Sequence, residues 1–117
     1  MGSDIQIGLS VDLQREAERL LDAAISGPQV DEVDGRPLPT PAGGSIVALD
    51  IRTGAILAAA SGPRFDLRTL LDHDAASWKA IQEDPRHPLF HRATEMALPP
   101  GSVFKIVTSI EIGRAHV

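Results

Sequence analysis

The chain has 117 residues, a length that fits one domain or part of one. Its 11 basic and 16 acidic residues give a formal net charge of −5 without a basic block, which argues against nucleic acid as a partner. There is no cysteine, which excludes disulfides, thiol catalysis and thiolate metal sites.

The first quarter of the chain is expected to form a strand and then a helix. Apolar residues alternate with polar or small ones from Ile5 to Val11, which is typical of a half-buried strand. A helix is expected next, capped by Ser10 or Asp12 and ended by Gly27-Pro28. One face of it gathers the apolar residues Leu13, Ala17, Leu20, Leu21 and Ala24. Its charged residues are expected to form a solvated face.

A loop and a β-hairpin are expected in the middle of the chain. Residues 29–44 are rich in proline and glycine, which indicates a loop. Residues 45–50 and 55–61 are predicted to be two strands joined by residues 51–54, with Gly54 suited to a left-handed position. The second strand is rich in alanine, which suggests that a helix packs closely across it.

The segment after the hairpin is expected to form short helices and a connecting loop. The helices are predicted over residues 70–82 around Trp78, with Asp74 or Ser77 as caps. Arg92 is expected to anchor the following loop by hydrogen bonds to backbone carbonyls. The histidines at 73, 87 and 91 do not have metal-ligand spacing, so no metal site is expected.

The most informative stretch lies near the end, where a stiff turn leads into a helix. Pro99 and Pro100 fix the backbone of the approach, and Gly101 allows a sharp turn. Ser102 then starts an apolar, helix-compatible run that continues through Ile106, Val107 and Ile110, a face expected to pin the helix to the sheet. Lys105 follows three residues after Ser102, which puts the hydroxyl and the amine on one helical face.

A serine and a lysine at this spacing can form a nucleophile and its base. A hydroxyl needs a neighbouring base to take its proton, and an amine serves if its surroundings lower its pKa. The free N–H groups of a helix start can stabilise an oxyanion. Ser-x-x-Lys alone is a weak pattern, however, because a capping serine and a solvated lysine produce it too.

The residues around this pair give it a family resemblance. The run from Pro99 to Thr108 closely resembles the active-site segment of penicillin-binding transpeptidases, and the run from Asp84 to Thr94 resembles the approach segment of their class B, elongation-type branch. The hairpin shares the likeness, and so does the segment Phe65-Asp66-Leu67 that follows it, although Leu67 departs from the proline that commonly follows this aspartate in the family. The resemblance implies an α+β fold, the antiparallel sheet packed with helices of the penicillin-binding transpeptidases and serine β-lactamases.

The resemblance also implies an activity. Ser102 would be the acylated nucleophile of a peptidoglycan D,D-transpeptidase, with Lys105 as general base and the Ser102 N–H as half of the oxyanion hole. Peptidoglycan stem peptides would be the substrates and β-lactams covalent inhibitors, with no cofactor, no metal and no nucleic acid. The family is tethered by an N-terminal membrane helix with its catalytic domain outside the cytoplasm, and elongation-complex proteins are candidate partners. The alternatives are a β-lactam sensor or β-lactamase-type protein, and a non-catalytic interaction module.

The boundaries of the resemblance set further expectations. Residues 1–111 are expected to be the N-terminal part of a transpeptidase domain whose C-terminal portion, with the second and third catalytic motifs, is missing. Residues 112–117 are expected to be a non-native read-through tail, because ATC-GGA-AGA-GCA-CAC-GTC would encode them and matches a common sequencing adapter. The 117-residue chain by itself is therefore expected to be inactive.

Overall fold

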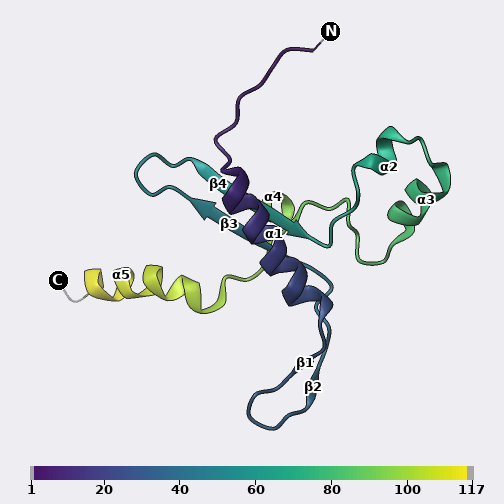
Figure 1. The fold of residues 1–117 in the computed structure, drawn as a ribbon. Coiled ribbons are helices and arrows are strands. Elements are labelled where there is room, and N and C mark those ends of the chain that lie inside the picture. The colour runs from purple at the N-terminus through teal and green to yellow at the C-terminus, as the bar shows by residue number, and fades with distance from the viewer. Residues whose placement is uncertain (1, 116–117) are drawn as a thin grey trace.

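A computed structural model describes residues 2–115 as a two-stranded hairpin flanked by helices, with several extended connections (Figure 1). The fold is mixed α+β, as predicted. In chain order the elements are α1 (Val11–Ser26), β1 (Gln29–Val30), β2 (Pro37–Leu38), β3 (Gly44–Leu49), β4 (Ile56–Gly62), α2 (Arg68–Leu71), α3 (Ala75–Glu83), α4 (Arg92–Glu95), the 3-10 helix η1 (Gly101–Phe104) and α5 (Lys105–Ala115).

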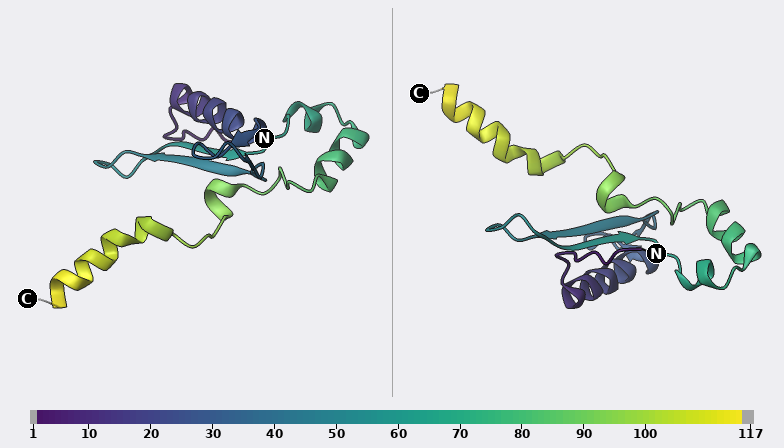
Figure 2. Two further views of the ribbon diagram at one scale, coloured as in Figure 1. Left: turned by 90° about the horizontal axis from the view of Figure 1, so that it is seen from below. Right: turned by 90° about the horizontal axis from the view of Figure 1, so that it is seen from above.

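The β3–β4 hairpin is the centre of the fold, and its prediction is confirmed. The strands are antiparallel, with Ser45 opposite Ser61 and a register irregularity between Ala48 and Leu49. Gly54 takes φ 75° in the connecting loop, a conformation that glycine adopts without steric cost. One face of the hairpin lies against α1 and the other against α4, as Figure 2 shows.

Helix α1 covers the hairpin and forms the core with it. Ala17 and Leu21 are buried against Ala58 and Ala60, which are 0% and 1% exposed. The small alanine side chains let the helix approach the strand closely, so the close packing predicted from this alanine-rich strand is confirmed. The cap is also confirmed, because the Ser10 side chain accepts a hydrogen bond from the Leu13 N–H.

The buried stripe of α1 is rotated relative to the prediction. Leu13 and Leu20 were expected to face the core but are 42% and 48% exposed. The residue at the start of the stripe is instead polar: Gln14 accepts a hydrogen bond from the Ala59 N–H at 2.7 Å and donates one to the Ala59 carbonyl at 3.2 Å. These two bonds satisfy backbone groups at the free edge of β4, which the apolar periodicity of the helix does not reveal.

Two other expectations on backbone structure are wrong. Residues 5–10 form no strand; a backbone hydrogen bond joins Ser10 to Leu57, but Ile5 and Ile7 remain 84% and 65% exposed, so alternation alone does not produce a ladder. Residues 29–44 were expected to be a loop but contain the small β1–β2 hairpin. Its turn is closed by Asp31, whose carboxylate accepts from the Val33 N–H at 2.8 Å.

The short helices after the hairpin are confirmed. Asp74 caps α3 by accepting from the N–H groups of Ala76 and Ser77. Trp78 packs edge-on against Phe65, with ring centroids 6.4 Å apart. This contact ties α3 to the chain that leaves β4.

Helix α5 does not pack on the hairpin, contrary to the expectation. Ile106, Val107 and Ile110 are 70%, 46% and 54% exposed, and among the described elements α5 contacts η1 alone. The hairpin has two strands, with α1 on one face and α4 on the other, so its faces are already in contact with helices. Figure 2 shows α5, in yellow, extending away from this packed unit.

Candidate active site

The turn that carries Ser102 is built as the sequence predicted. Gly101 takes φ 60°, in the left-handed region that favours glycine, and so redirects the chain after Pro100. Ser102 lies in η1, which leads directly into α5. The prediction that Ser102 lies near a helix N-terminus is confirmed.

Ser102 and Lys105 are the two ends of one tight helical turn. The Lys105 N–H donates to the Ser102 carbonyl, the i to i+3 hydrogen bond that closes a 3-10 turn. Side chains three residues apart eclipse one another in such a turn, so the hydroxyl and the amine project from the same side. Both residues are exposed, and within residues 2–115 no hydrogen bond joins the two side chains. Among the described residues, neither the Ser102 hydroxyl nor the Lys105 amine is engaged by a helix cap or by another side chain, so the two groups are available to pair with each other.

Arg92 anchors the segment that approaches this turn, as predicted. Its guanidinium donates to the Arg86 carbonyl at 2.6 Å and to the His87 carbonyl at 3.3 Å. It also lies 5.7 Å from the centroid of the Phe90 ring. The planar guanidinium of Arg92 therefore contacts three residues of the connection between α3 and α4.

A second contact joins the same segment to strand β4. The Arg92 N–H donates to the Ser61 hydroxyl at 2.8 Å, and that hydroxyl donates to the Phe90 carbonyl at 3.4 Å. A Cβ added at Gly43 would collide with the backbone carbonyl oxygen of Gly62 and would lie 2.5 Å from Arg92 Nε. The Arg92 side chain could move away, but the Gly62 backbone could not do so easily, so glycine at position 43 is required by close approach, a role that the sequence alone did not suggest.

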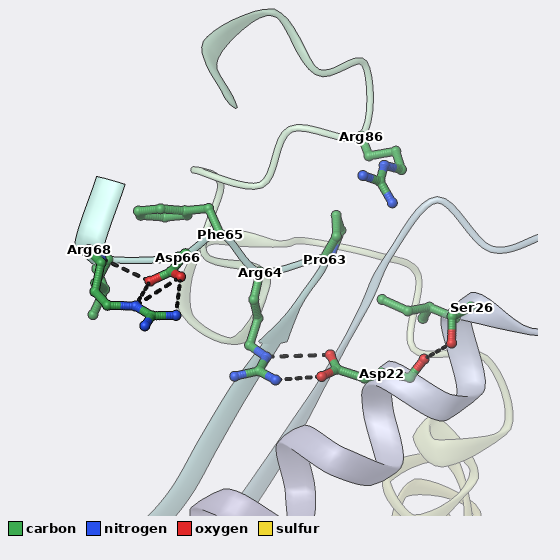
Figure 3. Close-up of a pocket in the computed structure, with 10 residues that line it drawn as sticks. Asp22, Ser26, Pro63, Arg64, Phe65, Asp66, Arg68 and Arg86 are labelled. Atoms are coloured by element: carbon green, nitrogen blue, oxygen red, sulfur yellow. Dashed lines mark hydrogen bonds and ion pairs between the residues drawn. The ribbon is translucent and has the colours of Figure 1, made fainter. Parts of the chain in front are cut away.

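A cluster of charges between α1 and the chain after β4 was not anticipated. Arg64 pairs with Asp22, as Figure 3 shows, and also with Glu18 at 3.0 Å. Both carboxylates were expected to be solvated. Hydrogen bonding to Asp22 raises the pKa of Arg64. The i, i+4 spacing of the two acids could have indicated a shared basic partner, but no local pattern identifies Arg64 as that partner.

Three arginines line the shallow cleft beside this cluster. Arg64, Arg68 and Arg86 are each paired with carboxylates, and Figure 3 shows the pairs of Arg64 and Arg68. Among the described residues, no histidines and carboxylates gather in a group of three or more that could hold a metal ion. Within the same part of the chain, no helix has the length and apolar character needed to cross a membrane.

Comparisons with known proteins agree with the resemblance of the Ser102 segment. Residues 44–112 match the family model of the penicillin-binding protein transpeptidase domain. The chain is 44% identical over 73 residues to the peptidoglycan D,D-transpeptidase PbpA of Mycolicibacterium smegmatis, which covers 59% of the chain and 15% of that relative. It is 30% identical over 117 residues to the peptidoglycan D,D-transpeptidase MrdA of Escherichia coli, which covers 99% of the chain and 16% of that relative.

These matches cover a small part of each relative. No solved structure matches the chain. The chain spans about 15% of the length of the PbpA and MrdA relatives, and the matched part includes the hairpin, α4, η1 and most of α5. From the family model, which covers more than half of its residues, the chain belongs to the penicillin-binding protein transpeptidase domain family.

Proposed function

We propose that the protein containing this chain is a peptidoglycan D,D-transpeptidase that acts through an acyl-serine at Ser102. The 3-10 turn that stacks Ser102 and Lys105 on one side carries the proposal. Nucleophilic catalysis needs a hydroxyl and a base within reach of it. Here an exposed hydroxyl follows the turn at Gly101, and an amine lies one helical turn later. The names of the PbpA and MrdA relatives support the same reaction class.

The proposed reaction begins with acylation of Ser102. Lys105 Nζ, in its neutral form, takes the hydroxyl proton while Ser102 Oγ attacks the carbonyl carbon between the two D-alanines of a stem peptide. The oxyanion that forms accepts a hydrogen bond from the Ser102 N–H. Collapse breaks the C–N bond and expels the terminal D-alanine, whose amine takes the proton from Lys105.

The second half of the reaction returns the enzyme to its starting state. The amine of a neighbouring stem peptide attacks the Ser102 ester, forms the new peptide bond and returns a proton to Ser102 Oγ. A β-lactam presents a similar amide and would leave Ser102 acylated. In this proposal the domain works outside the cytoplasm on a membrane tether, with elongation-complex proteins as partners; the tether and these partners rest on the family resemblance.

The domain boundaries stay predictions. The match of the family model through residue 112 lies one residue beyond the expected end of the family segment at 111. The proposed tail, residues 112–117, is helical through Ala115, and its last two residues lie outside the described part of the chain.

Covalent labelling of the full-length protein tests the proposed function. Fluorescent penicillin should label the wild type with one molecule per chain, and Ser102→Ala should abolish the label. Ser109→Ala is the matched control, because Ser109 lies on the same exposed helix and its hydroxyl donates to the Lys105 carbonyl at 2.7 Å. Labelling that persists in Ser102→Ala, or that is lost in Ser109→Ala, would contradict the assignment of the nucleophile.

A labelled protein must also transfer the acyl group. With a D-Ala-D-Ala stem peptide as donor and a second stem peptide as acceptor amine, the wild type should form a cross-linked product and Ser102→Ala should form none. A protein that is acylated by penicillin but forms no cross-link would be a β-lactam sensor, and the proposal would be wrong.

A further inference from the structure

We infer that Arg92 is a positioning residue for Ser102: it fixes the connection through which the packed hairpin holds the Ser102 turn. The inference rests on the proposed function and names a residue that acts through the backbone. It begins with an asymmetry in the fold. Helix α4 contacts both β3 and β4, whereas η1 and α5 contact no described element other than each other. Among the described residues, the Ser102 turn is therefore linked to the hairpin by the chain that leaves α4.

Arg92 is the first residue of α4 and fastens it in two directions. Toward β4, its N–H donates to the Ser61 hydroxyl at 2.8 Å. Toward the preceding loop, its guanidinium donates to the carbonyls of Arg86 and His87. Arginine suits this geometry because its planar fork can reach two carbonyls at once and stays charged.

The loop that Arg92 holds is not in a relaxed conformation. His87 takes φ 52°, a left-handed conformation that is uncommon for a residue with a side chain. Such a conformation persists only where surrounding contacts fix it, and the hydrogen bond from Arg92 to the His87 carbonyl is one such contact. Loss of the guanidinium would remove this contact and loosen the loop that leads into α4, although the backbone N–H of residue 92 could still donate to Ser61.

Displacement of α4 would be passed on to Ser102. Residues 96–100 connect α4 to η1, and the consecutive prolines Pro99 and Pro100 limit how far that connection can bend independently. Acyl transfer is sensitive to such shifts, since a misplacement of about 1 Å can cost about 10²-fold in rate. Arg92 should therefore affect the rate of acylation without contacting the substrate.

The test is the acylation kinetics of the full-length protein with fluorescent penicillin, with the rate constant and the final labelled fraction measured separately. Arg92→Gln should lower the rate constant about 10- to 100-fold and leave the labelled fraction near one per molecule. Arg92→Lys keeps the charge but not the planar guanidinium, so its rate constant should lie between those of the wild type and Arg92→Gln. Ser61→Ala, which leaves the guanidinium in place, should lower the rate in the same direction. Arg19→Gln is the matched control, because Arg19 pairs with Glu16 on the surface of α1.

The outcomes separate this inference from the proposed function. A merely structural role would reduce the labelled fraction, which reports the folded population, and leave the rate constant of that population unchanged; this result would overturn the inference. Arg92→Lys at the full wild-type rate would overturn the two-carbonyl anchor. If Arg92→Gln does not fold, Arg92→Lys and Ser61→Ala decide the question by the same rate constant. A wild type that is not labelled at Ser102 would remove the proposed function itself, and the inference with it.

Discussion

In the packed unit of α1, β3 and β4, the side chains of Ala58 and Ala60 are fully enclosed, whereas Val103 and Ile106 in the Ser102 segment are 76% and 70% exposed. The packed unit makes contacts between residues far apart in the sequence, and the Ser102 segment is shaped by its own hydrogen bonds. The difference separates two requirements of the proposed site. The relation of Ser102 to Lys105 is set within one turn, whereas we infer that the position of that turn depends on the connection through α4.

The largest expected effect concerns the exposed segment. In the full-length protein, Lys105→Ala should slow acylation by about 10²–10⁴-fold, the typical contribution of a general base. The thermal unfolding of the Lys105→Ala variant should match that of the wild type, because the Lys105 side chain is exposed and makes no hydrogen bond among the described residues.

The chain offers one matched control for this change. Lys79, the other lysine, lies on α3 and pairs with Glu83 at 3.8 Å, so Lys79→Ala should keep the wild-type rate. Stopped-flow labelling with fluorescent penicillin measures both variants. An unchanged rate in Lys105→Ala would show that Lys105 is not the base.

The second prediction concerns the packed unit and stability. Ala58 is 0% exposed beneath α1, so Ala58→Leu should overpack the interface and lower the free energy of unfolding of the domain by about 1–3 kcal/mol. Ala23→Leu, on the exposed side of the same helix, should stay within about 0.5 kcal/mol of the wild type. Urea denaturation of the full-length protein measures both. Equal effects of the two substitutions would contradict the close packing of α1 on β4.

The smallest expected effect lies in the loop between the two regions. A hydrogen bond from the Arg86 side chain lowers the pKa of Asp84 below its usual 3.8, so the folded loop favours the carboxylate. This contribution is present above the unfolded pKa and is lost as the pH falls through the lower, folded pKa. A carboxyl-carbon NMR titration should show the lowered pKa, and Arg86→Gln, which keeps the carbonyl that Arg92 binds, should return it toward 3.8. A pKa that Arg86→Gln does not move would contradict the pairing.

Local patterns predicted the local structure well. The strand pair with Gly54 in its loop, the Asp74 cap of α3, the Ser10 cap of α1 and the glycine turn before Ser102 each depend on a few neighbouring residues. The carbonyl anchor at Arg92 was also predicted.

Features that depend on distant partners were missed. Two contacts with distant residues orient α1 and so its buried stripe. Gln14 forms hydrogen bonds with the edge of β4, 45 residues later in the chain, and Asp22 pairs with Arg64. The docking of α5 on the sheet was expected from an apolar face, but an apolar face does not specify its partner. The crowding at Gly43 arises where the residue before β3 meets the end of β4 and the start of α4, which no sequence period records.

The measurement that tests the central claim most directly is peptide mapping by mass spectrometry of the full-length protein after reaction with penicillin. The account predicts one penicilloyl adduct, on the peptide that contains Ser102, with Lys105 unmodified. An adduct on any other serine, or stoichiometric labelling that leaves the Ser102 peptide unmodified, would contradict it.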